Sequence, residues 1–144
     1  MKRAAFATCL LTAGLFAPTF VAQAQQEPAV DCQNATTQSD MTICAAQDYE
    51  AADTLLNAVY KQAMAGMQAT DKDLAEIDEN DVGAVAALKK AQRAWIGYRD
   101  GQCELAGFEA RGGSMEPMLV AACLADLTRK RTQELNDLLE NLEN

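Results

Sequence analysis

The stretch AQRAWIGYRDGQC, residues 91–103, carries the only tryptophan of a 144-residue chain, together with two arginines and a cysteine. Through this stretch and the residues before it, large side chains recur at three- and four-residue steps: Val85, Leu88, Gln92, Trp95, Arg99 and Cys103. This spacing predicts an α-helix over about residues 82–110 with one buried side. We expect Trp95 in the core, because a large aromatic side chain buries well between helices.

A first helix is predicted ahead of this stretch, over about residues 38–68. Its apolar side chains have the same spacing: Met41, Cys44, Ala45, Ala52, Leu55, Leu56, Val59, Ala63 and Met67. Thr37, with Asp40 three residues later, is a variant of the capping box, which supplies acceptors to the free amides of a helix start. The helix is therefore expected to begin directly after Thr37.

A third helix is predicted over about residues 115–141. Its apolar positions again step at helical spacing: Leu119, Cys123, Leu127, Leu135, Leu138 and Leu142. The pair Gly112-Gly113 separates it from the second helix, because glycine permits the left-handed backbone of a helix stop. No stretch alternates apolar and polar residues between hairpin turns. The expected fold is therefore all-α, an antiparallel three-helix bundle or hairpin stapled by two disulfides.

The connection between the first two helices, residues 68–81, is acidic and has no clear apolar stripe. Its six carboxylates are opposed by Lys72 alone, so we expect a solvated link with at most partial helix. Four of its side chains are candidate partner-binding residues: Asp71, Asp73, Asp78 and Asp81.

No metal site is expected in the chain. Asp78, Asn80 and Gly83 match the first, third and sixth positions of an EF-hand loop. However, Val82 occupies a ligand position and Lys89 stands where the loop needs a bidentate glutamate. A zinc site is disfavoured too, because the chain has no histidine and no CxxC pair.

The N-terminus has the pattern of a secretory signal peptide. Lys2 and Arg3 precede an uncharged apolar stretch that ends in Ala22-Gln23-Ala24, a small-x-small cleavage site. We therefore expect a signal peptide over residues 1–24, an N-terminal arm over 25–36 and a helical domain over 37–144. The expected location is periplasmic or secreted, with no membrane anchor after cleavage, because Cys9 lacks the surroundings of a lipid-attachment cysteine.

Composition narrows the classes of function. Without histidine, neither a serine triad nor a cysteine–histidine pair is available, and close carboxylate pairs carry no specific signal among 21 acidic residues. We therefore expect no enzyme activity and no cofactor. The net charge of −9, about −11 after loss of residues 1–24, argues against nucleic acid or an anionic membrane as partner.

Four cysteines remain after loss of the signal peptide, which favours two disulfides in an oxidising compartment. Three pairings are possible. Cys103 and Cys123 lie about ten residues on either side of the glycine pair, so antiparallel helices would bring them face to face. Cys32 would then join Cys44 and tie the N-terminal arm to the first helix.

The two arginines of the opening stretch are expected to form ion pairs. Arg93 and Arg99 have Asp53, Asp100 and Glu104 as candidate partners. On the first helix, two tyrosines and an aspartate could complete a polar layer beside them: Tyr49, Asp53 and Tyr60. This interpretation makes the arginines stabilising residues.

The sequence also resembles the lysozyme-inhibitor LprI-like family. The resemblance covers nearly all of the chain after residue 24 and rests on these positions: Cys32, Met41-Thr42-Ile43-Cys44-Ala45, Tyr49, Ala52-Asp53, Leu56-Asn57, Tyr60, Leu88, Gln92-Arg93-Ala94-Trp95, Tyr98-Arg99-Asp100, Cys103, Gly112-Gly113-Ser114, Cys123 and Thr128 to Arg131. It implies a secreted or periplasmic helical domain. At least one lipid-anchored member of the family inhibits lysozyme, and we expect this chain to differ by lacking that anchor.

Two hypotheses of function follow. In the first, the domain blocks a basic lysozyme through its acidic surface, since opposite charge speeds association. In the second, it is a structural or envelope-stress interaction module whose acidity keeps it soluble. A contiguous, protruding acidic surface beside exposed aromatic residues would favour inhibition, whereas evenly spread charge would favour the module.

Overall fold

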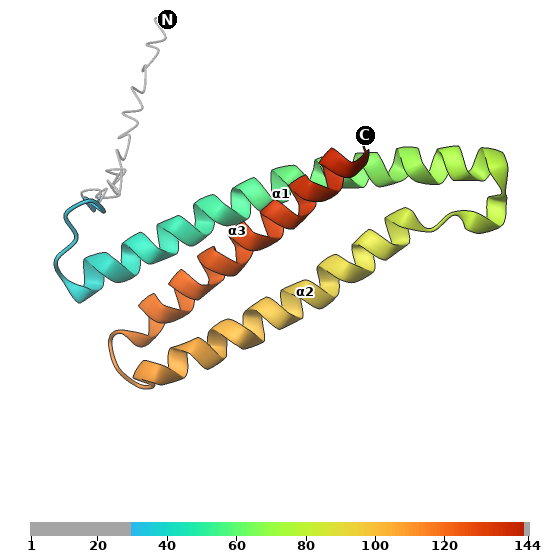
Figure 1. The fold of residues 1–144 in the computed structure, drawn as a ribbon. Coiled ribbons are helices and arrows are strands. Elements are labelled where there is room, and N and C mark those ends of the chain that lie inside the picture. Colours follow the sequence, from blue (N-terminus) through green and yellow to red (C-terminus); the bar gives the residue numbers. More distant parts are fainter. Residues whose placement is uncertain (1–29, 143–144) are drawn as a thin grey trace, which may run out of the picture.

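The computed structural model describes residues 30–142, so the predicted signal peptide lies outside the described residues. Five helical elements follow one another: α1 (Gln38–Ile77), η1 (Glu79–Asp81), α2 (Ala84–Gly107), η2 (Phe108–Ala110) and α3 (Glu116–Leu142). Figure 1 shows α2 running antiparallel to both α1 and α3. Within the described residues the predicted all-α bundle of three helices is confirmed.

The length of α1 differs from the sequence-based expectation. The sequence predicts an end near residue 68, but the helix continues to Ile77. Along this extension, Leu74 is half-buried on one side while most charged side chains are exposed on the other. A helix tolerates charge on its solvent side, so an acidic run does not end it. The helix ends where the backbone of Asp78 becomes extended.

The core is one apolar layer to which all three helices contribute. Its buried members are Leu56, Val59, Ala63, Met67, Leu88 and Leu135. Two glycines let the helices approach closely. A Cβ on Gly66 of α1 would lie 2.8 Å from Leu142 Cδ1 of α3, and one on Gly107 of α2 would lie 2.7 Å from Val120 Cγ2 of α3. At Gly107 the neighbour is a short β-branched side chain that has little room to move, so this contact favours glycine, whereas the flexible Leu142 could move away from a Cβ at residue 66.

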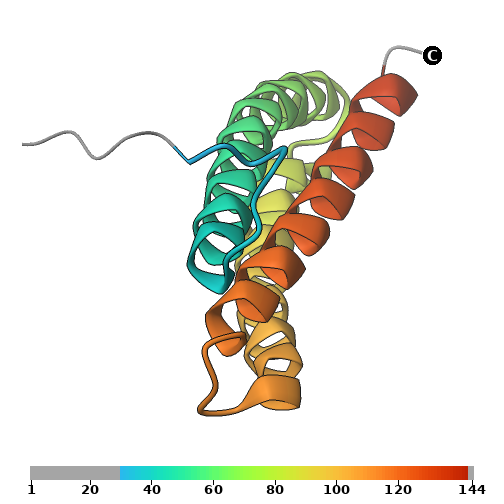
Figure 2. The ribbon, with the colours of Figure 1, turned by 90° about the vertical axis from the view of Figure 1, so that its left-hand side faces the viewer.

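Both predicted disulfides are confirmed. Cys103 is fully buried and joins Cys123 across the α2–α3 turn, with a Cα–Cα distance of 5.4 Å. Cys32 joins Cys44 over 5.5 Å and ties the N-terminal arm to α1. Since α2 is antiparallel to its neighbours, both bonds lie at the same end of the bundle, which Figure 2 views end-on. We call this region the disulfide end.

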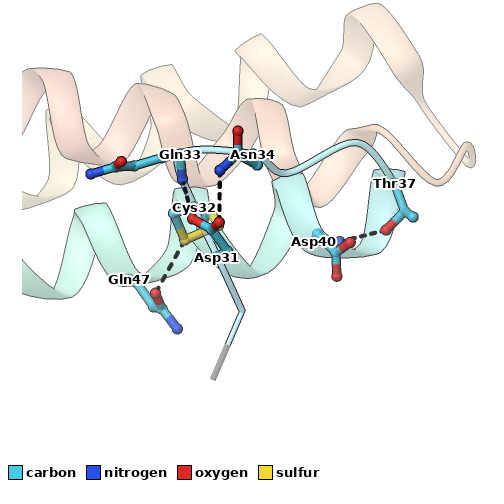
Figure 3. Close-up of a disulfide and its surroundings, with 8 residues drawn as sticks. Asp31, Cys32, Gln33, Asn34, Thr37, Asp40 and Gln47 are labelled. Carbon is cyan, nitrogen blue, oxygen red and sulfur yellow. Dashed lines mark hydrogen bonds between the residues drawn. A yellow bond between two sulfur atoms is a disulfide. The ribbon is translucent and has the colours of Figure 1, made fainter. Parts of the chain in front are cut away.

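The N-terminal arm is also held by local hydrogen bonds (Figure 3). The carboxylate of Asp31 accepts from Asn34 Nδ2 at 2.7 Å and from the backbone N–H of Gln33 at 3.0 Å. These two bonds, with that of Asn34 the stronger, lower the pKa of Asp31. The hydroxyl of Thr37 accepts from the backbone N–H of Asp40 at 3.1 Å, which confirms the predicted cap of α1.

Candidate functional site

Arg99 is the centre of a charged and aromatic cluster between α1 and α2. Its side chain is only 10% exposed. Its Nε donates to Asp100 Oδ1 at 2.9 Å, and an Nη donates to Asp53 Oδ1 at 3.4 Å. The guanidinium carbon lies 5.0 Å from the centre of the Trp95 ring and 5.5 Å from that of Tyr49. We call these five residues the Arg99 cluster.

The chemistry of the Arg99 cluster suits a structural link between helices. A guanidinium group can stack on aromatic faces while its edge donates to carboxylates, so one side chain makes contacts in two directions. Burial raises the pKa of the Tyr49 hydroxyl; the charge of Arg99 opposes this shift, while Asp53 and Asp100 add to it. The hydroxyl therefore stays protonated at neutral pH. The one cation of the cluster, Arg99, is only 10% exposed and is held by its partners, so it is not accessible to a ligand.

The motif residues of the opening stretch lie on different sides of α2. Trp95 is half-buried and packs against the core, and Arg99 forms the expected ion pairs. Arg93 is exposed and makes no ion pair within residues 30–142, so the expected pairing is wrong for this residue. Tyr98 is 59% exposed. Of these four residues, Trp95 and Arg99 therefore face the bundle, whereas Arg93 and Tyr98 face solvent.

A second polar link, which sequence reasoning missed, joins α2 to α3. Arg131 Nε donates to Gln92 Oε1 at 3.1 Å, and its Nη donates to Glu134 at 2.7 Å. The pairing depends on the register of two helices across a turn, and no local pattern reports that register. Tyr60, expected beside the arginines, packs instead against the apolar core.

The carboxylate of Asp71 caps the start of α2. Its Oδ1 accepts from the backbone N–H groups of Gly83 at 2.7 Å and Ala84 at 2.6 Å, and its Oδ2 accepts from Val85 at 3.1 Å. These bonds lower the pKa of Asp71 below its ordinary 3.8, and the bond from Gly83 contributes most to this shift. The first amides of a helix have no partner within the helix, so a carboxylate from α1 satisfies those of α2. This candidate partner-binding residue is thus engaged in the fold.

Asp78 is engaged in a similar way, whereas the other two candidates are not. The backbone N–H and the side-chain amide of Asn80 donate to Asp78 Oδ1 at 2.9 and 2.8 Å and lower its pKa. The side chains of Asp73 and Asp81 are exposed and make no hydrogen bond or ion pair within the described part of the chain. Asp73 and Asp81 therefore have their whole carboxylates free for a partner, and the exposed Asp78 keeps its Oδ2 free.

Further exposed side chains surround these two aspartates. Glu76 and Glu79 are exposed, and so is Asp78, so five carboxylates face solvent along this segment. Between them Ile77 is 83% exposed, the highest value among the large apolar residues of the described chain. The segment therefore combines negative charge with an apolar contact, although it has no exposed aromatic ring.

This segment projects from the bundle. The end of α3 lies beside Gly66, whereas α1 continues to Ile77, about 16 Å further at 1.5 Å per residue. Figure 1 shows the connection to α2 extending past the end of α3. We call residues 71–83 the acidic turn. Its position leaves it accessible to a large partner.

An apolar groove of about 390 Å³ lies where α2 begins, between the three helices. It is lined by Met67, Ala84, Ala87, Leu88, Ala91, Arg131, Glu134, Leu135 and Leu138. The alanines at the start of α2 leave this space, because their side chains are too short to fill it. Sequence reasoning missed the groove, and the run of alanines was the available signal.

Two further properties concern the described residues 30–142. Within them, no three or more cysteine, aspartate or glutamate side chains are placed to hold a metal ion. None of their helices has the length and apolar character that crossing a bilayer requires.

The fold and these surfaces define a class: small helical bundles linked by disulfides, with a polar cluster inside and an acidic turn outside. The chain belongs to the lysozyme inhibitor LprI family, whose pattern matches residues 31–135. Family membership and the disulfide pattern agree with the resemblance found in the sequence.

Individual relatives are consistent with this assignment. An uncharacterized protein of Rhizobium meliloti strain 1021, R02472, is 67% identical over 119 residues, which are 83% of this chain and 86% of that protein. YecT of Escherichia coli strain K12, also uncharacterized, is 31% identical over 80 residues, 52% of this chain and 48% of YecT. A crystal structure of a DUF1311 family protein from Pseudomonas putida KT2440 has the same fold, with a TM-score of 0.58 and 21% identity over 72% of this chain and 93% of that one.

Proposed function

We propose that the protein is exported and inhibits a basic lysozyme through its acidic turn. Membership of a lysozyme inhibitor family supports lysozyme as the partner. One observation supports this surface as the binding site: the acidic turn projects beyond α3 and presents Ile77 among five exposed carboxylates.

The physical properties of the acidic turn suit such a contact. Negative charge attracts a basic enzyme from a distance and steers its approach. Ile77 adds apolar contact area, which carboxylates cannot supply and which dominates binding energy at most interfaces. The caps formed by Asp71 and Asp78 hold the turn in one conformation, so less conformational entropy is lost when it binds.

Export is the second part of the proposal. Residues 1–24 have the pattern of a signal peptide, and disulfides persist mainly in oxidising compartments. A periplasmic or secreted location would place the protein where it meets lysozymes. Intact-mass analysis of the exported protein should give a chain that begins at Gln25, whereas retention of residues 1–24 would contradict this part.

The test uses two triple variants with the same change in net charge. Asp73→Asn, Glu76→Gln and Asp81→Asn remove three of the six negative charges of the acidic turn and leave its capping residues Asp71 and Asp78 in place. The purified wild-type protein should slow the clearing of bacterial cell-wall suspensions by basic lysozymes. This triple variant should require roughly tenfold more protein for the same inhibition, because each lost charge pair contributes a few tenths to one kcal/mol.

The control variant neutralises three exposed carboxylates elsewhere: Glu50→Gln, Glu109→Gln and Asp126→Asn. It should inhibit as the wild type does. An equal loss in both variants would mean that net charge, not the acidic turn, carries binding. Unchanged clearing with excess wild-type protein, across a panel of lysozymes at low salt, would reject inhibition and leave the structural or envelope-stress module as the function.

A further inference from the structure

Helix α2 has a second uncharged face, most of which no described part of the chain covers; at its two ends, Ala84 packs against the core and the guanidinium of Arg111 lies 4.5 Å from the centre of the Phe108 ring. Its residues alternate three- and four-residue steps through the helix and its C-cap: Ala84, Ala87, Ala91, Ala94, Tyr98, Gly101, Leu105 and Phe108. Such a repeat is the seam of a coiled coil. Tyr98, Leu105 and Phe108 are 59%, 62% and 53% exposed. We call these eight residues the outer face of α2.

The two halves of the outer face differ in size. Its large side chains, Tyr98, Leu105 and Phe108, lie in the C-terminal half, while the N-terminal half contains only alanines. The apolar groove opens beside those alanines, since Ala84, Ala87 and Ala91 belong to its lining. One half therefore offers protruding side chains and the other half offers space.

We propose that the outer face of α2 pairs antiparallel with the outer face of a second copy of this chain. The outer face alternates two kinds of coiled-coil position, and antiparallel pairing sets one kind against the other. In this register Tyr98 packs on Ala94 of the second copy and Leu105 packs on its Ala87. Phe108 then packs on Ala84 of the second copy. Each of these layers sets a large side chain against a small one. Two-fold symmetry repeats every contact, as in most protein dimers.

Charge complementarity selects the same register. Lys90 and Glu104 share one heptad position on the flank of the outer face, and neither makes an ion pair within residues 30–142. Antiparallel pairing sets Lys90 of each copy beside Glu104 of the other. Parallel pairing in register would lose both of these ion pairs and would set the large side chains of the outer face against each other. Flanking charges of this kind determine the orientation of coiled coils.

The proposal also accounts for two features that the single chain leaves unexplained. Leu105 and Phe108 of the second copy would lie over the groove beside Ala84 and Ala87, which would cover it. Gly97 and Gly101 are inside α2, where glycine weakens a helix, and a Cβ at either position would meet nothing within the chain. If a second helix approaches closely near the symmetry axis, a larger residue would not fit at these positions, which explains why both are glycine.

Sedimentation equilibrium of the purified, oxidised protein tests this inference without any lysozyme. We expect a mass twice that of one chain, falling to one chain on dilution. Lys90→Glu, which sets like charges together twice in the dimer, should raise the dissociation constant roughly tenfold or more. Glu104→Lys should do the same. The double variant Lys90→Glu/Glu104→Lys keeps the wild-type charge and should restore dimerisation.

Two further variants separate this interface from general effects. Leu105→Glu should raise the dissociation constant at least about a hundredfold, because an apolar contact is lost twice. Lys61→Glu on the outer side of α1 makes the same charge change as Lys90→Glu and should leave the mass unchanged. Wild-type protein that stays a single chain at millimolar concentration would overturn the proposal. So would a dimer that none of the α2 variants weakens.

Discussion

The two ends of the bundle are held together by different kinds of interaction. At the disulfide end, two covalent bonds and the buried Arg99 cluster join α1, α2, α3 and the N-terminal arm. At the opposite end, the acidic turn is held by hydrogen bonds to the carboxylates of Asp71 and Asp78. The first end buries one charged group, Arg99, between its helices, whereas the charged groups of the second end are mostly exposed.

The difference teaches how a small domain can carry a concentrated charge. Exposed carboxylates along one turn repel one another, and that repulsion destabilises the folded chain. Crosslinks at the other end offset such a cost by restricting the unfolded chain. A surface for a partner can therefore lie far from the contacts that keep the domain folded, and each end can be changed separately.

The largest expected effect comes from the buried disulfide. Cys103→Ala/Cys123→Ala should lower the free energy of unfolding by about 3 kcal/mol, the loop-closure value for a separation of 20 residues. Cys32→Ala/Cys44→Ala removes a bond that closes a loop of 12 residues. It should cost less, because the loop is shorter and because the freed arm can detach while the bundle stays folded. Urea unfolding of both variants measures the difference. Equal losses would contradict the ranking.

The Arg99 cluster should give the next largest effect. Arg99→Ala removes two ion pairs and two aromatic stacking contacts, so we expect a loss of about 2 kcal/mol in the free energy of unfolding. Arg99→Lys keeps the charge but not the planar group, and should cost about half as much. Arg93→Ala on the same helix is the control and should change stability by less than about 0.5 kcal/mol.

At the acidic turn, a smaller loss with a defined pH dependence is expected. Asp71→Ala should lower the Tm by several degrees at neutral pH, whereas Asp73→Ala, which removes an exposed carboxylate, should not. The folded-state pKa of Asp71 lies below its ordinary 3.8, so its stabilisation is complete above 3.8 and is lost as pH falls through the lower value. Thermal unfolding should show the difference between variant and wild type shrinking well below 3.8. A constant difference would argue against the carboxylate as the cap.

The smallest effect concerns rate rather than stability. Raising the salt concentration to roughly 0.5 M should slow association with a basic lysozyme without lowering the Tm of the protein, because salt screens the attraction to the enzyme and also the repulsion among the exposed carboxylates. The ion pairs of the buried Arg99 should be screened much less. Stopped-flow association at two salt concentrations, with parallel melting curves, checks this. A clear fall in the Tm over the same increase in salt concentration would contradict this distinction between the two ends.

Sequence patterns predicted the disulfide end better than the acidic turn. Cysteine spacing around Gly112-Gly113 predicted both bonds, and helical periodicity placed Trp95 and Arg99 toward the bundle. Such features follow from local spacing and a simple antiparallel topology. The fold class was predictable for the same reason.

Features that depend on tertiary register were not predictable. Acidic residues suggested a link after residue 68, yet α1 continues because its charges lie on the solvent side. The cap by Asp71 needs amides twelve or more residues away, and no local pattern reports that distance. An ion pair was expected for Arg93 as well as for Arg99. Arg93, however, lies on another side of the helix, where no partner within residues 30–142 reaches it.

Hydrogen–deuterium exchange on the complex with a basic lysozyme tests most directly whether the acidic turn is the binding end. The bound protein should gain protection at residues 72–83, while residues 91–103, already held by the Arg99 cluster and the buried disulfide, should change little. Protection confined to residues 91–103, or no change at the acidic turn in a saturated complex, would contradict the account.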